Sequence, residues 1–197
     1  MKLRGLYAIT PEKSGILDKV RGALEGGISL LQYRCKKPDL AEARELAALA
    51  REYRVPLIIN DDVELALELG ADGAHLGRED GDLRAARRKL ASRILGASCY
   101  ASLDTARAAV AAGADYIAFG SVFASPTKPH APRAPLSLFR EARSLGVPIC
   151  AIGGITLDNA SSVLSAGADL LAVISDLFDA PDIAARARAY ARLFHEK

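Results

Sequence analysis

The chain has 197 residues, of which half are hydrophobic and a quarter are charged, as in ordinary globular proteins. Its net charge of +2 is too small to indicate binding to nucleic acid or to an anionic membrane. No stretch reaches the roughly 18 uninterrupted apolar residues of a membrane span, and the first ten residues show no signal-peptide pattern. We therefore expect a cytoplasmic protein.

The three cysteines, Cys35, Cys99 and Cys150, are odd in number and widely spaced, which argues against a disulfide framework or a zinc site. We expect three reduced thiols. Cys35 and Cys99 lie beside residues that are assigned to a site below, so a thiol nucleophile at one of them is the alternative.

Short apolar runs alternate with helical patterns along the whole chain. Most runs are near-continuous and bounded by Gly, Pro, Asn or Asp, as in parallel strands that are buried on both faces. The predicted strands are Leu6–Ile9, Ile28–Tyr33, Leu57–Ile59, Gly73–Leu76, Ile94–Ala97, Tyr116–Phe119, Ile149–Ile152 and Leu170–Ile174. They make eight.

The intervening segments have apolar residues three or four apart, which predicts amphipathic helices. Clear cases are Asp39–Tyr53, with Asp39 as a plausible N-cap, Asp104–Ala112 and Leu157–Ala166. A Gly-Ala-Asp motif at residues 70, 113 and 167 follows a predicted helix and precedes a predicted strand, and Gly26-Gly27 lies at a similar junction. Glycine there can end the helix in a left-handed conformation, so these junctions indicate a repeated unit.

Strict alternation of strands and helices predicts a parallel sheet with right-handed crossovers. Eight units favour closure into a compact α/β fold, a single-domain (β/α)8 TIM barrel that spans residues 1–197. An open doubly wound sheet is the alternative, but no Gly-x-Gly-x-x-Gly follows the first strand. The longest predicted loop, residues 120–135, contains four prolines, and a loop of this length is usually functional.

Function in such barrels usually resides at the C-terminal ends of the strands. After the second strand, Gln32, Arg34 and Lys36 alternate, so an extended chain points them to one side. Two cations and an amide suit a polyanion, because arginine can bind two phosphate oxygens at once. A solvated basic loop is the alternative.

Carboxylates follow the next two strands, at Asp61 and Asp62 and again at Glu79 and Asp80. Magnesium takes one or two carboxylates together with substrate phosphate oxygens, so these side chains predict a Mg²⁺ site. The alternative for Asp62 and Asp80 is that each only caps the helix that follows.

The later strand ends also carry polar groups. Ser98 ends the fifth strand, and the loop after the sixth contains Ser125, Thr127 and Lys128, which could bind a second anion. Gly153-Gly154 and Ser175 follow the last two strands, where β/α barrels frequently bind phosphate through backbone N–H groups. Thr156 could cap the helix after those glycines.

His75 lies within a predicted strand, and we expect it to be a structural side chain with satisfied hydrogen bonds. No role is predicted for His130 or His195. The lack of a well-placed histidine argues against a reaction that needs a general base near neutral pH.

Eight segments together, in this order, resemble the thiamine-phosphate synthase family. They are GLYAIT (5–10), LQYRCK (31–36), LIIND (57–61), GAHLGRED (73–80), GASCY (96–100), DYIAFGSVFASPTK (115–128), AIGGITLDN (151–159) and AGADLLAVIS (166–175). No single motif is unique, but the ordered set covers all eight strands.

The resemblance implies an enzyme that transfers an alkyl or aryl group. A hydroxymethylpyrimidine diphosphate and a thiazole phosphate would join, with Mg²⁺ as cofactor, to give thiamine phosphate and pyrophosphate. The implied partners are these small molecules, with neither nucleic acid nor membrane, and the sequence leaves a homo-oligomer open.

The resemblance also implies roles for particular residues. Asp61 and Asp80 would hold Mg²⁺, and Arg34, Lys36 and Lys128 would be the catalytic cations. The pyrimidine diphosphate would contact Gln32, Arg34, Lys36, Asn60, Ser98 and Lys128, and the thiazole phosphate would contact Ser125, Thr127, Gly154, Ile174 and Ser175. Tyr33 and Pro126, within the same segments, are also predicted to contact substrate.

The chain departs from the common family pattern at Cys35, Ser121, Tyr100 and Ser125, the last with its hydroxyl kept. Tyr100 stands where many relatives have histidine, and the related thiazole tautomerase uses a histidine near that position. The alternatives to the synthase are such a tautomerase and a non-catalytic barrel that binds thiazole phosphate as a regulator. The intact cations and carboxylates favour the synthase.

Overall fold

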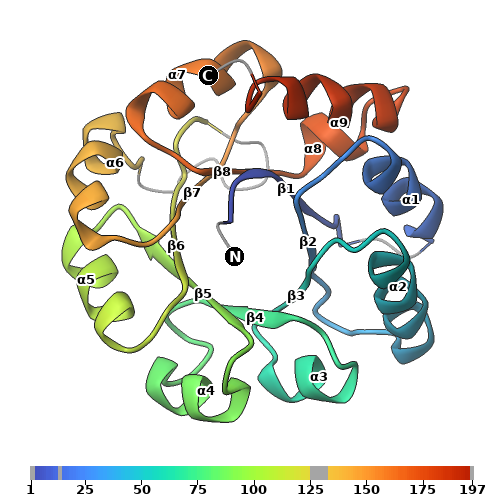
Figure 1. The fold of residues 1–197 in the computed structure, drawn as a ribbon, viewed down its shortest axis with the longest axis horizontal. Helices are drawn as coiled ribbons and strands as arrows, with labels where there is room; N and C mark the ends of the chain where they lie inside the picture. Colours follow the sequence, from blue (N-terminus) through green and yellow to red (C-terminus); the bar gives the residue numbers. More distant parts are fainter. Residues whose placement is uncertain (1–2, 13–14, 125–132, 196–197) are drawn as a thin grey trace.

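Eight parallel strands form a closed barrel surrounded by helices, as viewed in Figure 1. The computed structural model describes residues 3–12, 15–124 and 133–195. Each strand pairs with the next along the chain, and β8 pairs with β1 to close the ring. The strands are β1 (Gly5–Ile9), β2 (Leu30–Tyr33), β3 (Leu57–Asn60), β4 (Gly73–Leu76), β5 (Ile94–Tyr100), β6 (Tyr116–Phe119), β7 (Ile149–Ile152) and β8 (Leu170–Val173). The predicted (β/α)8 barrel is confirmed, and the open sheet is excluded.

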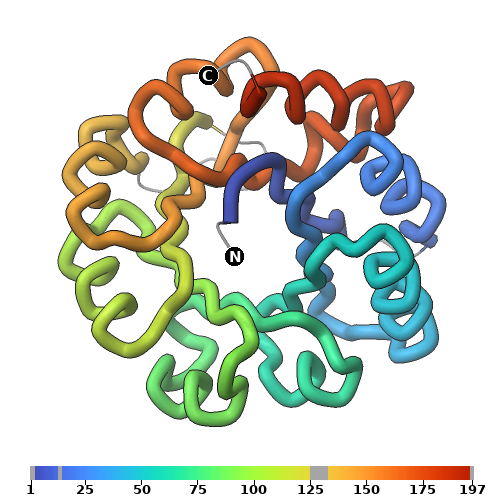
Figure 2. Tube along the Cα trace, in the orientation of Figure 1, coloured from blue at the N-terminus to red at the C-terminus, as the bar shows by residue number. Residues whose placement is uncertain are grey.

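The helices lie outside the barrel, and the tube in Figure 2 shows the chain passing repeatedly from strand to helix around the ring. They are α1 (Leu17–Glu25), α2 (Leu40–Glu52), α3 (Val63–Glu68), α4 (Leu83–Leu90), α5 (Leu103–Ala111), α6 (Leu136–Ala142), the 3₁₀ turn η1 (Arg143–Leu145), α7 (Leu157–Ala166), α8 (Ser175–Phe178) and α9 (Ile183–Arg192). Because all strands are parallel, all their C-terminal ends meet at one rim.

The predicted strand positions are correct, but one boundary matters for the site. The fifth strand was expected to end at Ala97, whereas β5 continues to Tyr100. Its pairing with β6 shifts register between Ser98 and Tyr100, as in a β-bulge. The extra residues were missed because Ser98 and Tyr100 are polar and resemble a loop in the sequence.

The core has two layers, as a closed barrel requires. The larger layer packs strand residues against the helices, with Leu6, Leu31, Ile59 and Phe119 among them. The second layer fills the barrel interior and includes Tyr7, Leu30, Ile58, Tyr116, Cys150 and Leu170. Alternate residues of each strand therefore face the interior, which explains why the strands appear apolar on both faces.

Aspartates cap several helices at the barrel's C-terminal rim. Asp39 accepts hydrogen bonds from two backbone N–H groups of α2, and Asp62 accepts one from Leu65 N at 2.8 Å, so both predicted caps are confirmed. Asp82 caps α4. The alternative in which Asp80 is that cap is therefore wrong, and Asp80 is available for another role.

The Gly-Ala-Asp junctions end helices at the opposite rim. Gly70, Gly113 and Gly167 all have positive φ, at 62°, 98° and 113°. The aspartate of each motif accepts a hydrogen bond from one of the first two residues of the preceding strand, as from Leu95 N to Asp115 Oδ2 at 2.7 Å. At the Gly26-Gly27 junction it is Gly27 that has positive φ. The motif thus couples neighbouring strands away from the predicted site.

Within the described residues, we find no helix that is both long enough and apolar enough to cross a membrane.

Candidate active site at the C-terminal rim

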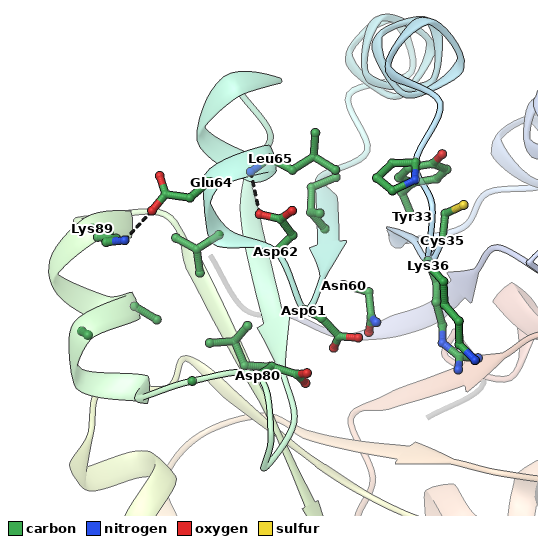
Figure 3. Close-up of a pocket in the computed structure, with 18 of the residues that line it drawn as sticks. Tyr33, Cys35, Lys36, Asn60, Asp61, Asp62, Glu64, Leu65, Asp80 and Lys89 are labelled. Atoms are coloured by element: carbon green, nitrogen blue, oxygen red, sulfur yellow. Dashed lines mark hydrogen bonds and ion pairs between the residues drawn. The ribbon is translucent and has the colours of Figure 1, made fainter.

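Six of the predicted site residues line one cavity of about 640 Å³ at the ends of β2, β3 and β4. They are Tyr33, Arg34, Lys36, Asn60, Asp61 and Asp80. Figure 3 shows this cavity, with Lys36 on one side and the Asp61 and Asp80 side chains on the other. The cavity therefore combines cations with carboxylates, as the sequence predicted.

The basic side of the cavity follows β2. The backbone N–H of Arg34 donates to Thr10 Oγ1 at 2.9 Å, which anchors the segment to the end of β1. The Arg34 guanidinium lies 3.5 Å from the Glu12 carboxylate. Glu12 also lines the cavity and was not predicted. Its sequence position, directly after the first strand, was the only available signal.

Tyr33 differs from its neighbours because its side chain packs into the outer core layer. Its hydroxyl is buried and has no hydrogen-bond partner within the described part of the chain. The alternation of β2 explains this orientation, since Gln32 and Arg34 flank Tyr33 on the opposite face. Tyr33 therefore forms part of the cavity wall, and its hydroxyl is not placed to bind substrate.

The acidic side brings together Asp61 and Asp80, whose carboxyl groups lie near one another in Figure 3. Asp61 has a left-handed backbone conformation, with φ of 65°, and its N–H donates to His75 O at 2.8 Å. Asp80 Oδ2 accepts from Gly77 N at 2.7 Å. The β3 and β4 ends thus fix both carboxyl groups at one place.

The environment raises the pKa of Asp61 to about 6. Desolvation is the main cause, followed by the hydrogen bond with Asp80 and the charge of Asp80, while Arg34 and Asn60 act in the opposite direction. Two carboxyl groups that oppose each other's ionisation make a favourable position for a cation. The donor set of hard oxygens fits Mg²⁺.

No group of three or more His, Cys, Asp or Glu side chains suited to hold a metal occurs in residues 3–12, 15–124 and 133–195. A Mg²⁺ ion bound by two carboxylates would complete its shell with water and substrate oxygens, which is its usual preference. The residues present therefore fit the ion only if an oxygen-rich substrate binds with it.

The four other acidic side chains that line the cavity already have partners, since Glu12 pairs with Arg34 and Asp82 caps α4. Asp62 caps α3, and Glu64 forms an ion pair with Lys89, as the dashed lines in Figure 3 show. These contacts leave Asp61 and Asp80 as the pair that faces the cations.

Gln32 and Ser98, both predicted to contact substrate, are joined by a chain of buried side chains. Gln32 Nε2 lies 2.6 Å from the Tyr7 hydroxyl, which lies 2.8 Å from the Tyr116 hydroxyl. His75 connects the Tyr116 hydroxyl to Ser98 Oγ, at 2.9 Å through Nδ1 and 2.8 Å through Nε2.

His75 is thus a buried side chain with both ring nitrogens satisfied, as predicted, and burial lowers its pKa to about 4. Its link to Ser98 was not predicted, nor were Tyr7 and Tyr116. The sequence offered one signal for the two tyrosines: each is a polar-tipped residue at an inward position of an otherwise apolar strand.

The glycines and the serine that were predicted to bind a phosphate follow β7 and β8. Gly154 has φ of 64°, and a Cβ there would lie 2.4 Å from Ala124 O, so only glycine fits this approach to the segment after β6. Thr156 and Asn159 form a capping box at the start of α7, which confirms the predicted cap. Ile174 precedes α8, and Ser175 is its first residue.

Four predicted residues, Ser125, Pro126, Thr127 and Lys128, lie outside the described residues. The structure therefore tests neither their position nor that of His130.

The three cysteines are free thiols, as predicted. Cys99 is buried in the layer between the strands and the helices, and burial raises its pKa to about 12. It is therefore protonated at neutral pH and faces away from the barrel interior. The Cys35 thiol donates to Lys37 O at 3.2 Å. Neither arrangement favours a thiol nucleophile.

Comparison with known proteins agrees with this geometry. Residues 6–177 match the family described as thiamine monophosphate synthase. The chain is 59% identical to a thiamine-phosphate synthase from Aromatoleum aromaticum over 98% of this chain and 97% of the relative. It is 53% identical to one from Methylobacillus flagellatus over 98% and 96%.

A solved structure, the thiamine phosphate pyrophosphorylase from Pyrococcus furiosus, has 37% sequence identity and a TM-score of 0.90, with 99% of this chain and 97% of that chain covered. The fold, the order of the eight segments and these similarities agree. The chain belongs to the thiamine monophosphate synthase family.

Proposed function

We propose that the C-terminal rim joins a hydroxymethylpyrimidine diphosphate to a thiazole phosphate, with release of pyrophosphate and formation of thiamine phosphate. The observation that supports this most strongly is the convergence of Arg34, Lys36, Asp61 and Asp80 on one cavity of about 640 Å³. A cavity with both signs of charge suits a diphosphate that binds together with a divalent cation.

In the proposed reaction, the C–O bond between the pyrimidine methylene and the diphosphate breaks, and its electron pair leaves with the diphosphate. The thiazole nitrogen uses its own lone pair to form the new C–N bond. No side-chain nucleophile is needed, which agrees with the protonated thiol of Cys99 and the buried, neutral imidazole of His75.

Negative charge grows on the leaving diphosphate, and we assign its neutralisation to Arg34, Lys36 and Lys128. Fixed charges that face developing charge are usually the largest single contribution to catalysis. Asp61 and Asp80 would hold Mg²⁺, which when bound adds positive charge beside the diphosphate oxygens. Asn60, between the two sides of the cavity, would contact the same diphosphate.

The remaining predicted residues are assigned to the two organic portions. Gln32 and Ser98, in the barrel mouth, would contact the pyrimidine, with Tyr33 as a wall. Ser125, Pro126, Thr127, Gly154, Ile174 and Ser175 would contact the thiazole phosphate. The positive φ of Gly154 supports this assignment, because backbone N–H groups around a left-handed residue can converge on an anion.

The direct test is to mix both substrates with the protein and Mg²⁺ and to measure thiamine phosphate and pyrophosphate. We expect the two products in equal amounts, and none when either substrate is omitted. Full turnover in excess EDTA would remove the proposed roles of Asp61 and Asp80. Conversion of the thiazole alone would indicate a tautomerase, and tight binding without turnover would indicate a regulatory barrel.

A further inference from the structure

A continuous set of side-chain hydrogen bonds crosses the barrel interior beneath the proposed site. It starts on β2, passes through β1, β6 and β4, and ends on β5. Its members in order are Gln32, Tyr7, Tyr116, His75 and Ser98, and these five residues are called the interior relay below.

The interior relay is shielded from water over most of its length. Gln32, Tyr7 and Tyr116 are at most 2% exposed, and His75 is 8% exposed. Only Ser98, at the upper end of β5, is partly accessible. Because buried polar groups pair with one another when water is excluded, each inner member depends on its two neighbours in the relay.

Packing around the relay holds the rings in place. The His75 and Tyr116 rings stack with centroids 5.5 Å apart, and Tyr7 meets Tyr116 edge-on at 5.9 Å. Gly96 lies beside the middle link, since a Cβ there would be 2.3 Å from the Tyr116 hydroxyl and 2.5 Å from His75 Nδ1. Only glycine therefore leaves room for this hydrogen bond.

The donors and acceptors of the relay have a direction. The Tyr7 oxygen accepts from the Gln32 amide nitrogen, and among the described residues only the Tyr116 hydroxyl can then accept the Tyr7 hydrogen. Pairing every buried donor therefore directs that hydrogen to Tyr116. Tyr116 in turn donates to His75 Nδ1, which must then be the acceptor nitrogen. A neutral imidazole with an unprotonated Nδ1 carries its hydrogen on Nε2. His75 therefore donates to Ser98.

We propose that the interior relay positions Ser98, by holding His75 as the Nε2–H tautomer and thereby turning the Ser98 hydroxyl hydrogen toward the substrate. The single hydrogen of the Ser98 hydroxyl is then available to the site, which favours a substrate atom that accepts a hydrogen bond, such as a ring nitrogen. His75, Tyr116 and Tyr7 are positioning residues that do not touch substrate. The inference rests on the proposed function for the assignment of Ser98 to the pyrimidine site.

The first test is the tautomer of His75 in the metal-free, substrate-free protein, measured by nitrogen-15 NMR of labelled histidine. The chain has three histidines, so replacing His130 and His195 by glutamine isolates the signal of His75. We expect a neutral ring with hydrogen on Nε2. In Tyr116→Phe, which removes the donor to Nδ1, we expect a mixture of tautomers. An Nδ1–H form in the wild-type background would overturn the proposal.

The second test is a double-mutant cycle on kcat/KM for the pyrimidine diphosphate. Tyr116→Phe should lower it about tenfold, the size expected for one hydrogen bond. In a Ser98→Ala background the same substitution should have no further effect, because the relay acts through Ser98. Equal losses in both backgrounds would contradict the proposal, since a purely structural role of Tyr116 predicts that result.

Cys150→Ala is the matched control, because Cys150 lies in the same interior layer as both tyrosines but forms none of the relay's hydrogen bonds. We expect unchanged kcat/KM and an unchanged His75 tautomer. If Tyr116→Phe fails to fold by circular dichroism, Tyr7→Phe interrupts the relay one link earlier and is predicted to give the same two results. Absence of product in the wild type would defeat the proposed function alone, because the tautomer is measured without substrate.

Discussion

Asp61 combines two features that a purely structural residue would avoid. Its backbone is left-handed, and its carboxyl group faces that of Asp80, with a pKa raised to about 6. A strained backbone conformation and a shifted pKa are both common at sites that are preformed for a ligand. The cation that we assign to this pair would relieve the repulsion.

The raised pKa of Asp61 predicts a pH-dependent stability in the absence of metal. Its folded pKa, about 6, exceeds the ordinary value of 3.8, so the folded state holds the proton more tightly. The resulting stabilisation is present below the ordinary value and is lost as the pH rises through about 6. Asp61→Asn, which keeps the tolerance for left-handed φ, should raise the metal-free Tm at pH 7.5 and leave it unchanged at pH 3.5. An equal Tm difference at both pH values would show that the charge is not the cause.

The same titration predicts weaker binding of Mg²⁺ in acid. A metal ligand must be deprotonated, so affinity should fall about tenfold for each pH unit below about 6. Isothermal titration calorimetry in the presence of pyrophosphate would measure this. Asp61→Asn should remove most of the affinity and make its fall with pH shallower, leaving the part that is due to protonation of pyrophosphate. Unchanged affinity between pH 7.5 and pH 5 would contradict the assignment.

Arg34 is the described cation that we expect to matter most for turnover. Replacing it by alanine should lower kcat/KM by about 10²–10³-fold, the range for loss of one charge-stabilising group. Arg44→Ala is a suitable control, because Arg44 pairs with Glu68 on the exposed helical surface. Steady-state kinetics with circular dichroism would separate the two effects. Similar rates for the two variants would remove Arg34 from the mechanism.

Much of the site could be predicted at the residue scale, because polar residues at strand ends stand out from apolar strands. Arg34, Lys36, Asn60, Asp61 and Asp80 were found in this way, and they share a cavity. Tyr7 and Tyr116 could not be predicted in this way, since a tyrosine within an apolar strand is also a normal core residue. Only the barrel register brings their hydroxyls together.

At the scale of elements, the two ends of the barrel have different tasks. The aspartates of the Gly-Ala-Asp motifs hold neighbouring strands together at one end, and Asp115 also pairs with Arg87 of α4 at 2.8 Å. The proposed substrate residues that the structure describes lie at the other end. In β/α barrels generally, one rim carries stability and the other carries function.

This division predicts that Asp115→Ala destabilises the protein without affecting catalysis. The Leu95 N–H would lose its acceptor, and an unsatisfied backbone donor costs about 1–3 kcal/mol. Urea denaturation should show this loss, with KM for both substrates unchanged. Asp104→Ala is the matched control, because the Asp104 side chain is 90% exposed and, among the described residues, pairs only with Arg107. It should change stability by less than about 0.5 kcal/mol.

The elements themselves were predicted well because strand and helix patterns alternate so regularly. The error at β5 has a physical reason. A strand that enters a site carries polar residues such as Ser98, and a register shift against β6 allows Tyr100 to remain in the sheet at φ of 54°. The pattern of hydrophobic residues in the sequence indicates neither the polar strand end nor the register shift.

At the scale of the whole molecule, we propose that residues 1–197 form one domain. Every described strand belongs to a single closed ring, and the last helix, α9, packs against the first strand and the first helix, β1 and α1. Loss of any one strand would open the ring. We expect one cooperative thermal transition in which circular dichroism and tyrosine fluorescence coincide. Two separate transitions would contradict a single domain.

The central claim is that cations and carboxylates from β2, β3 and β4 bind one departing diphosphate together with a metal ion. Calorimetric titration of pyrophosphate into the wild-type protein, Arg34→Ala and Asp61→Asn, each with and without Mg²⁺, tests this most directly. We predict tight binding only in the wild type with Mg²⁺, and at least tenfold weaker binding when either side chain or the metal is removed. Equal pyrophosphate affinity in all six titrations would contradict the account.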